Sequence, residues 1–400
     1  MHYIKLLRPP VLEGGESQAS LKLVLTITTD LGDSFLSPAE PIQLLVLGAY
    51  TKEIEGPNQL VHVDFAQPLI WRAGMRVLKV DAPVPWQFWR AIKTIQVRPR
   101  SPHLTAIRTS DIRAGKQGLI MAAYADISTR GDAAPFAVCF RSLRLPAPNR
   151  LLQFEEDIGD SIARHIWDGG VATASLLAEL CLESTAEAET LLPSLRSVLQ
   201  SPGQRPLNIL EVGCGIGVLG ISIAQILSSM QLPQGATATG ATTHILMTDL
   251  HEAETRARAN MVRQAESIAR GSASIQLDFE ALDWLDGKEG IFGDKVATRA
   301  WDLVVLSDCT YNTDTLSPLV KTLTAIHRHS ARRWVEGDEG GPRTTEVFVA
   351  TKPRHSSERI FFDLMTADGW FIRERAVLPL PVLDGEDQTV EVYLFRMKQE

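Results

Sequence analysis

The sequence predicts an α/β protein: a mostly parallel sheet that ends in an antiparallel strand pair, preceded by a β-rich N-terminal domain. Before residue 150, short runs rich in β-branched residues are separated by prolines, a pattern typical of strands. From residue 151 onward, candidate strands and helices alternate, which indicates a sheet covered by helices on both faces. A chain of 400 residues is long enough for two or three domains. We therefore expect a boundary near residue 150, with domains at 1–150 and 151–400.

The first domain is expected to consist of short strands and their connections. The segment LKLVLTITT alternates apolar and polar residues, as a half-buried strand does. No catalytic motif occurs in this domain. The predicted strands are residues 21–29, 41–47, 59–64, 75–80, 91–98 and 134–140.

The second domain is expected to alternate strands with helices. Its strands are predicted at 207–212, 245–247, 274–277, 301–306 and 346–350, with a closing pair at 370–377 and 390–396. Its helices are predicted within 160–182, where two glycines break or start a helix, and at 218–227, 253–269, 316–327 and 358–366. Two segments, 229–243 and 330–345, are Gly-rich or charged and are expected to be exposed loops.

The composition argues against several functional classes. The formal net charge of −8, from 40 basic and 48 acidic residues, argues against nucleic-acid binding as the main function. No apolar run approaches the ~18 residues of a membrane span, and the N-terminus shows no secretory signal. The four cysteines form no CxxC pair and the nine histidines no HExxH motif, so we expect neither a disulfide scaffold nor a metal site. We expect a protein of the reducing cytoplasm or nucleus.

The segment most informative about function is ILEVGCGIGVLG, residues 209–220. A predicted strand runs into Gly213, Gly215 and Gly217, and a predicted helix follows. Glycines permit a tight turn and a close approach of a ligand to the backbone, and the helix N-terminus beyond them offers free N–H groups. Residues 215–220 also spell GxGxxG, the dinucleotide fingerprint, so a nicotinamide cofactor and a turn without any ligand are the alternatives here.

Two acidic residues help to choose between these alternatives. Asp249 ends the next predicted strand, where an acid accepts hydrogen bonds from ribose hydroxyls. It follows Gly213 by 249 − 213 = 36 positions, and removing the 15 residues of 229–243 leaves 21, close to the usual ~20. Glu211 lies two residues before the first glycine, where it would repel a pyrophosphate. It suits a cofactor with positive charge and no phosphate, such as S-adenosylmethionine, which carries a sulfonium, an ammonium and one ribose.

Two further strand ends carry polar and aromatic residues. Asp283 and Trp284 follow the third strand, where the acid can accept from an adenine amino group and the indole can pack against the base. Asp308 follows the fourth strand, with Tyr311 three residues later. Ligands of open α/β sheets bind outside the carboxyl ends of the strands, so we expect these residues at one site with the glycine turn. Taken singly, Asp249 or Asp283 is also explained as a helix cap, Trp284 as a core aromatic and Tyr311 as an ordinary strand-end aromatic.

Several segments together carry a resemblance to a known family. They are IWDGG (166–170), EVGCGIGVLG (211–220), TDL (248–250) with Asn260 eleven residues after Asp249, LDW (282–284) and SDCTY (307–311). Over about residues 155–400 the sequence resembles the seven-β-strand, Rossmann-like methyltransferases, and within them the protein-lysine methyltransferases that modify elongation factors and chaperones. SDCTY matches that family's DxxY motif. The β-rich extension is similar to that of fungal members that act on translation elongation factors.

The resemblance implies a role for each matching residue. Asp308 and Tyr311 face the methyl-accepting nitrogen as the catalytic pair, and Asp249 holds the ribose hydroxyls. Glu211 and the glycine turn hold the methionine and ribose portion of S-adenosylmethionine. The implied cofactor-binding residues are Trp167, Glu211, Gly213, Cys214, Gly215, Gly217, Asp249, Asp283, Trp284 and Ser307, of which Trp284 holds the adenine and Ser307 lies beneath the cofactor.

The predicted function is methyl transfer from S-adenosylmethionine to a lysine side chain of a protein, with a translation elongation factor as the expected partner. Residues 1–150 favour a macromolecular substrate, since a small one needs no extra docking surface. The net negative charge is compatible with a basic protein surface. The alternatives are a methyltransferase for a small amine or another non-protein acceptor, a cofactor-binding interaction protein without catalysis, and a nicotinamide oxidoreductase.

Overall fold

The chain divides into two compact units whose segments interleave along the sequence. The first unit comprises Met1–Leu143, Gln153–His165 and Leu380–Gln388, and the second comprises Arg144–Leu152, Ile166–Pro379 and Thr389–Glu400. The computed structural model describes all residues except 15–18, 53–58, 66–67, 86–90, 130–137, 147–149, 160–161, 184–185, 201–205, 231–241, 337–342 and 399–400.

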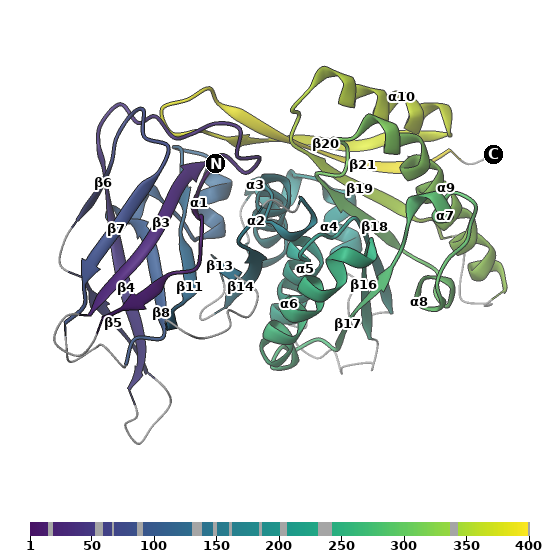
Figure 1. The fold of residues 1–400 in the computed structure, drawn as a ribbon. Helices are drawn as coiled ribbons and strands as arrows, with labels where there is room; N and C mark the ends of the chain where they lie inside the picture. The colour runs from purple at the N-terminus through teal and green to yellow at the C-terminus, as the bar shows by residue number, and fades with distance from the viewer. Residues whose placement is uncertain are drawn as a thin grey trace. The chain divides into compact units, whose positions relative to one another are not determined.

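The first unit is built almost entirely of strands (Figure 1). One sheet has the order β12-β2-β3-β1-β10-β9, with β7 also paired to β3, and the other has the order β14-β13-β11-β8-β4-β5, with β6 paired to β4. The elements are β1 (His2–Leu6), β2 (Val11–Glu13), β3 (Ser20–Thr28), β4 (Ile42–Lys52), β5 (Gln59–Asp64), β6 (Leu69–Trp71), β7 (Leu78–Pro83), β8 (Thr94–Pro99), η2 (Pro102–Leu104), β9 (Thr105–Ala106), α1 (Thr109–Ala114), β10 (Ile120–Met121), β11 (Ala123–Asp126), β12 (Ser128–Thr129), β13 (Val138–Arg144), β14 (Leu151–Asp157) and η3 (Ile162–Arg164).

Apolar side chains of both sheets form one core. Leu21, Leu23 and Leu25 of β3 are fully buried, as the alternation in that strand predicts, and they share a cluster with Leu44 and Val46 of β4. The six strands predicted for this region are present, as β3, β4, β5, β7, β8 and β13. Part of the last prediction, residues 134–137, lies outside the described residues. The β-rich character of the N-terminal region is confirmed.

A buried ion pair connects two strands of the first unit. The Nε of Arg141, on β13, donates to Oε1 of Glu156, on β14, at 2.7 Å, and both side chains are at most 5% exposed. The Nη1 of the same guanidinium donates to the carbonyls of Ile4 and Ala122, at 2.8 and 3.0 Å. A single side chain from one sheet therefore satisfies backbone carbonyls of β1 and of the segment between β10 and β11.

The second unit contains a sheet with the order β17-β16-β15-β18-β19-β21-β20. Strands β15 to β19 are parallel, whereas β21 runs antiparallel to β19, with Glu346 opposite Arg396. The predicted mostly parallel sheet with a C-terminal antiparallel pair is confirmed. The strands are β15 (Leu207–Val212), β16 (Thr243–Asp249), β17 (Ile275–Ala281), β18 (Leu303–Ser307), β19 (Glu346–Thr351), β20 (Trp370–Leu380) and β21 (Gln388–Met397).

Helices cover both faces of this sheet, with α2, α5 and α6 on one side and α9 and α10 on the other (Figure 1). Alternate residues of each buried strand face opposite helices: Leu210 and Val304 pack with Leu316 of α9, whereas Met247 lies against the start of α5. The helices and turns are α2 (Asp168–Leu182), α3 (Ala186–Thr190), α4 (Pro193–Leu199), α5 (Val218–Ser229), α6 (His251–Ala269), α7 (Trp284–Gly287), α8 (Asp294–Ala297), α9 (Thr313–Glu336), η4 (Ser356–Arg359) and α10 (Ile360–Ala367). No helix in the described part of the chain is long and apolar enough to cross a membrane.

One predicted loop is partly wrong. Residues 330–345 are charged and Gly-rich, yet α9 continues through residue 336, and residues 337–342 lie outside the described residues. The reason is a tertiary contact: Ser330 is fully buried and its Oγ accepts a hydrogen bond from the backbone N–H of Trp301 at 2.9 Å. Of the other predicted loop, 229–243, residues 231–241 also lie outside the described residues.

We expect Glu156→Gln to destabilise the first unit strongly. The substitution leaves the Arg141 guanidinium buried without its anion, a loss of about 3–5 kcal/mol in unfolding free energy. Urea unfolding followed by circular dichroism measures this effect. Asp157→Asn is the matched control, because Asp157 pairs with Arg164, whose side chain is 38% exposed, and such a pair contributes about 1 kcal/mol or less. Equal losses in the two variants would contradict the structural role of the buried pair.

Candidate active site

The predicted site residues gather at the carboxyl ends of the parallel strands. β15 runs into the glycine turn, β16 ends at Asp249, Trp284 comes shortly after β17, and Asp308 directly follows β18. Because these strands are parallel, their carboxyl ends share one edge of the sheet. The backbone N–H of Gly215 donates to Oδ2 of Asp249 at 2.7 Å, so two of these ends are joined directly.

The turn after β15 requires its glycines. Gly213, Gly215 and Gly217 have φ angles of 72°, 54° and 86°, in the region that L side chains rarely adopt. A Cβ on Gly213 would lie 2.5 Å from the sulfur of Cys309, too close for any side chain. Asp249 holds the turn in place, and its second oxygen accepts from the N–H of Leu250 at 2.7 Å. Each carboxylate oxygen has a further lone pair, so Asp249 can still accept hydrogen bonds from ribose hydroxyls, as predicted from the sequence.

Glu211 is a buried acid beside this turn. It is 1% exposed, and its Oε2 accepts from the N–H of Gly220, the third residue of α5, at 2.9 Å. A Cβ on Gly220 would lie 2.4 Å from that oxygen, so this glycine lets the helix start against the carboxyl group. Burial, reinforced by the charge of Asp249, raises the pKa of Glu211 to about 8. No cation of the described residues pairs with Glu211, so the turn suits a ligand with positive charge.

The two cysteines near the turn are packing residues. Cys214 and Cys309 are buried, and burial together with the nearby carboxylates raises the pKa of each thiol well above its usual value. The Sγ of Cys309 lies 3.4 Å from the carbonyl of Val212 and 3.6 Å from that of Gly213. A thiol held in its neutral form is a poor nucleophile, so these positions contribute shape rather than covalent chemistry.

Asp283 and Trp284 behave differently from each other. Asp283 is exposed and caps α7, its Oδ1 accepting from the N–H of Leu285 at 2.8 Å, which is the helix-cap alternative considered from the sequence. Trp284 is partly buried, and its Cζ2 lies 3.4 Å from the point where a Cβ on Gly213 would be. The indole therefore borders the glycine turn. The predicted contacts of both residues with an adenine base stay predictions.

Asp308 lies at the centre of a hydrogen-bond network. It has a positive φ of 54°, which is costly for a residue with a side chain, and is 8% exposed. Its Oδ2 accepts from the N–H of Gly169 at 2.7 Å, and its Oδ1 accepts from the N–H of Lys352 and from Arg354 Nη1, both at 3.1 Å. The bond to Gly169 satisfies one of the free N–H groups at the start of α2, so Asp308 fixes that helix to the ends of β18 and β19.

The neighbours of Asp308 on either side differ in burial. Ser307 ends β18, and its Oγ lies 3.5 Å from the point where a Cβ on Gly170 would be, so it packs under the first turn of α2. Tyr311 is 52% exposed and is therefore accessible from solvent at the same strand end. Burial of the rest of its ring and the nearby acids raise the pKa of its hydroxyl, which stays protonated near neutral pH.

The sequence interpretation missed residues at the end of the fifth parallel strand. Lys352, directly after β19, places its Nζ 2.7 Å from Oδ2 of Asp168, with both side chains at most 5% exposed. The guanidinium carbon of Arg354 lies 5.3 Å from the ring centroid of Trp167. The strand-end rule that identified Asp249 and Asp308 points to these two cations as well, since TKPR follows the predicted strand EVFVA.

Further hydrogen bonds hold the loop that follows β19. Glu358 accepts from the N–H groups of Arg354 and His355, at 3.2 and 3.0 Å, and from the hydroxyl of Thr310 at 3.4 Å. The hydroxyls of Thr310 and Thr351 lie 2.7 Å apart. The ends of β18 and β19 are thus joined to each other and to the start of η4, which fixes the position of Arg354.

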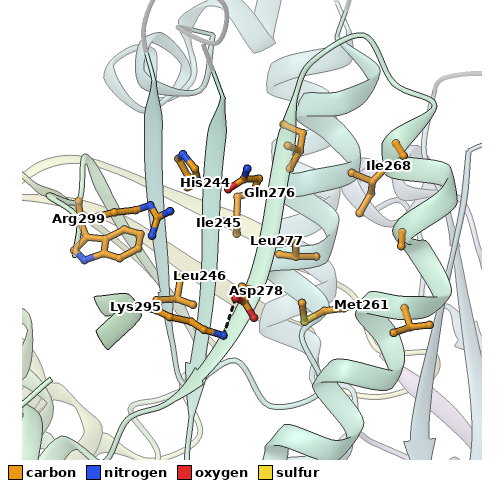
Figure 2. Close-up of a pocket in the computed structure, with 15 residues that line it drawn as sticks. His244, Ile245, Leu246, Met261, Ile268, Gln276, Leu277, Asp278, Lys295 and Arg299 are labelled. Atoms are coloured by element: carbon orange, nitrogen blue, oxygen red, sulfur yellow. Dashed lines mark ion pairs between the residues drawn. The ribbon is translucent and has the colours of Figure 1, made fainter. Parts of the chain in front are cut away.

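A separate cavity lies at the opposite end of the same sheet. Its volume is about 550 Å³. Figure 2 shows residues that line it, among them His244 and Gln276 near the starts of β16 and β17, and Met261 of α6. Lys295 borders it and pairs with Asp278 of β17. Since Asp249 ends β16 at the other edge, this cavity is distinct from the predicted site.

Comparison with known proteins finds similar sequences and structures over about half of the chain. A curated relative, a UPF0665 family protein of Schizosaccharomyces pombe, is 25% identical over 225 residues, which cover 56% of this chain and 52% of that protein. The chain thus spans about half the length of this relative. Among solved structures, an S-adenosylmethionine-dependent methyltransferase of Methanosarcina mazei is 14% identical, over 52% of this chain and 99% of that one, with a TM-score of 0.32. An arsenic(III) S-adenosylmethionine methyltransferase of Chlamydomonas reinhardtii is 12% identical, over 56% and 73%, with a TM-score of 0.31.

The match that carries most weight is to a protein family. The sequence profile of the lysine methyltransferase family matches residues 146–368, more than half of the chain and the whole stretch from IWDGG to SDCTY. The family resemblance found in these motifs is thereby confirmed. The protein belongs to the lysine methyltransferase family.

Proposed function

We propose that the protein transfers methyl groups from S-adenosylmethionine to a lysine side chain of another protein, and that this substrate is a translation elongation factor. The observation that carries the first part is the buried Glu211 beside the glycine turn, in a chain of the lysine methyltransferase family. The choice of an elongation factor as substrate rests on the resemblance of residues 1–150 to the β-rich N-terminal extension of fungal family members.

The choice of cofactor follows from the charges at the turn. Glu211 and Asp249 are both acids whose pKa values are raised, chiefly by burial, and among the described residues no cation forms an ion pair with either of them. A pyrophosphate at this point would add negative charge to a buried acid and be repelled. The sulfonium and ammonium of S-adenosylmethionine would instead supply the missing positive charge. The residues present therefore fit this cofactor and disfavour a nicotinamide dinucleotide.

The chemistry requires a neutral amine in line with a methyl donor. When bound, S-adenosylmethionine supplies a methyl group on sulfur, and the acceptor nitrogen forms the new N–C bond as the electron pair of the S–C bond returns to sulfur. A free lysine has a pKa of about 10.4 and must first lose a proton to solvent. Asp308, already bound by three donors, orients rather than takes up this proton. Tyr311, half exposed, offers its ring face or hydroxyl to the nitrogen.

The acceptor can be identified in one experiment. The purified protein is incubated with tritiated S-adenosylmethionine and a cell lysate, and the products are separated on a gel and by a small-molecule filter. A single labelled protein band, named by mass spectrometry, is expected to be an elongation factor modified on lysine. Label confined to the filtrate indicates the small-amine alternative. Cofactor binding without any transfer indicates a binding protein without catalysis.

Cofactor affinity is expected to depend on pH near 8. A cation binds the ionised form of Glu211 more tightly, and its pKa is about 8 in the free protein. As pH falls below this value the carboxylate takes up a proton, so affinity falls by up to about tenfold per pH unit. Calorimetry between pH 6.5 and 9, in buffers with different ionisation enthalpies, measures the affinity and the proton released on binding. A flat profile without proton release would contradict the role of Glu211.

Glu211→Gln is the control for this profile. It keeps an acceptor for the Gly220 N–H but removes the charge, so binding is weaker and the pH dependence is lost. A carboxyl pKa raised by folding makes the native state bind more protons than the unfolded state, so stability falls as pH rises from about 4.5 to about 8. At pH 8.5 the glutamine variant therefore melts at a higher temperature than the cofactor-free wild type. If this variant binds the cofactor weakly although it is more stable, misfolding cannot be the cause of the weak binding.

Two further substitutions are expected to affect different steps. Asp308→Ala abolishes methyl transfer while the dissociation constant for S-adenosylmethionine stays within a few fold, because its carboxylate orients the acceptor side of the site. Asp249→Ala instead weakens cofactor binding by about tenfold or more, since it removes the ribose acceptor and the bond to Gly215. Binding is measured by equilibrium dialysis and transfer by labelling. Full activity of the Asp308 variant would remove it from the mechanism.

A further inference from the structure

The loop after β19 brings a cation into contact with two residues of the predicted site. Arg354 Nη1 lies 3.1 Å from Oδ1 of Asp308, and the guanidinium carbon lies 5.3 Å from the ring centroid of Trp167. The side chain of Arg354 is 17% exposed and that of Asp308 is 4% exposed. One guanidinium therefore contacts both the residue predicted to hold the cofactor and the residue predicted to face the acceptor.

An unpaired carboxylate at this place would oppose the reaction. A lysine ammonium beside a carboxylate is stabilised in its charged form, by roughly 1–3 pKa units in a partly buried setting. The charged form has no lone pair for attack on the methyl group. A carboxylate that guides the amine into place thus also slows its activation, unless another cation offsets the negative charge.

We propose that Arg354 is a positioning residue for the transfer step, which pairs with Asp308 and stacks on Trp167 so that the carboxylate does not hold the entering lysine as an ammonium ion. This inference rests on the proposed function. The lysine proton passes to solvent, the nitrogen lone pair forms the N–C bond, and the S–C electron pair stays on sulfur. The positive charge moves from sulfur to the methylated nitrogen, where it again lies near Asp308.

The other charged groups around this pair already have partners. Asp168 of α2 is paired with Lys352, and Glu358 of η4 accepts from the N–H groups of Arg354 and His355. The start of α2 adds a partial positive charge at the Gly169 N–H. Tyr311 after β18 is neutral near pH 7, because the ordinary pKa of a tyrosine hydroxyl, about 10, lies far above that pH and burial raises this pKa further. Among the described residues, Arg354 is the cation that forms an ion pair with Asp308.

The test compares the pH dependence of transfer in three arginine variants. Enzyme and tritiated S-adenosylmethionine are used in excess over the acceptor in a lysate from cells that lack the protein, so the labelled band grows with a first-order rate constant for the bound complex. We expect Arg354→Met to be about tenfold slower than wild type at pH 7, with the gap closing towards pH 9.5 as the midpoint of its profile moves about one unit higher. Arg354→Lys keeps the charge and therefore the wild-type midpoint.

Arg359→Met is the matched control. Arg359 also pairs with an acid, Glu391 at 2.9 Å, and lies over a ring, that of Phe362, but its side chain is 58% exposed and it does not contact Asp308. This variant is expected to keep the wild-type profile. Arg354→Gln gives a second neutral variant should Arg354→Met not fold.

Two results would overturn the inference, and they differ. If the wild type labels a protein but the ratio of Arg354→Met to wild-type rates is constant across pH, Arg354 acts only through packing and the inference fails alone. If the wild type labels no protein at any pH, the proposed function fails and the inference fails with it. Dissociation constants for S-adenosylmethionine, measured on each variant, show that the cofactor is saturating throughout.

Discussion

The carboxylate of Asp308 is the contact on which the site depends. It lies where β18 leaves the sheet, and it joins the start of α2 to the loop after β19 through Gly169, Lys352 and Arg354. Asp308 makes these contacts from a backbone with a positive φ, a conformation that costs about 1–3 kcal/mol for a residue with a side chain. Three hydrogen bonds to the carboxylate, one of them from a guanidinium, offset that cost. Together with the ion pair between Lys352 and Asp168, they hold the start of α2, next to Trp167, at the sheet edge.

The acids at this edge fall into two electrostatic groups. In the described part of the chain, Glu211 and Asp249, beside the glycine turn, accept only from backbone N–H groups, and their pKa values are raised, so a cationic ligand would stabilise their ionised forms. Asp308, by contrast, is paired with a cation of the protein. Such a division is what a reaction between a cationic donor and an amine requires. The donor side must attract positive charge, whereas the acceptor side must not stabilise an ammonium.

Local patterns in the sequence predicted most of the second unit. The strand at 207–212 was predicted to the residue, because a run of apolar residues between a polar segment and a glycine turn has few other structures available. The length of α9 was not predicted, since Ser330 is buried by a partner, Trp301, that no local pattern reveals. The short strands β9 to β12 were missed for the same reason: two to four residues carry too little periodicity, and their pairing is decided by distant segments.

Position at a strand end was a sound guide to location but not to role. Asp249 ends one parallel strand and Asp283 follows another, yet Asp249 accepts a hydrogen bond from the glycine turn, whereas Asp283 is exposed and caps a short helix. The sequence gives both the same residue type in the same place, and what separates them is burial. Arg354 shows the converse, because it too comes after a parallel strand but was not singled out from the sequence. Its contacts with Trp167 and Asp308 join positions 167, 308 and 354, and only folding brings such distant residues together. A charge is therefore informative about chemistry only once its partner is known.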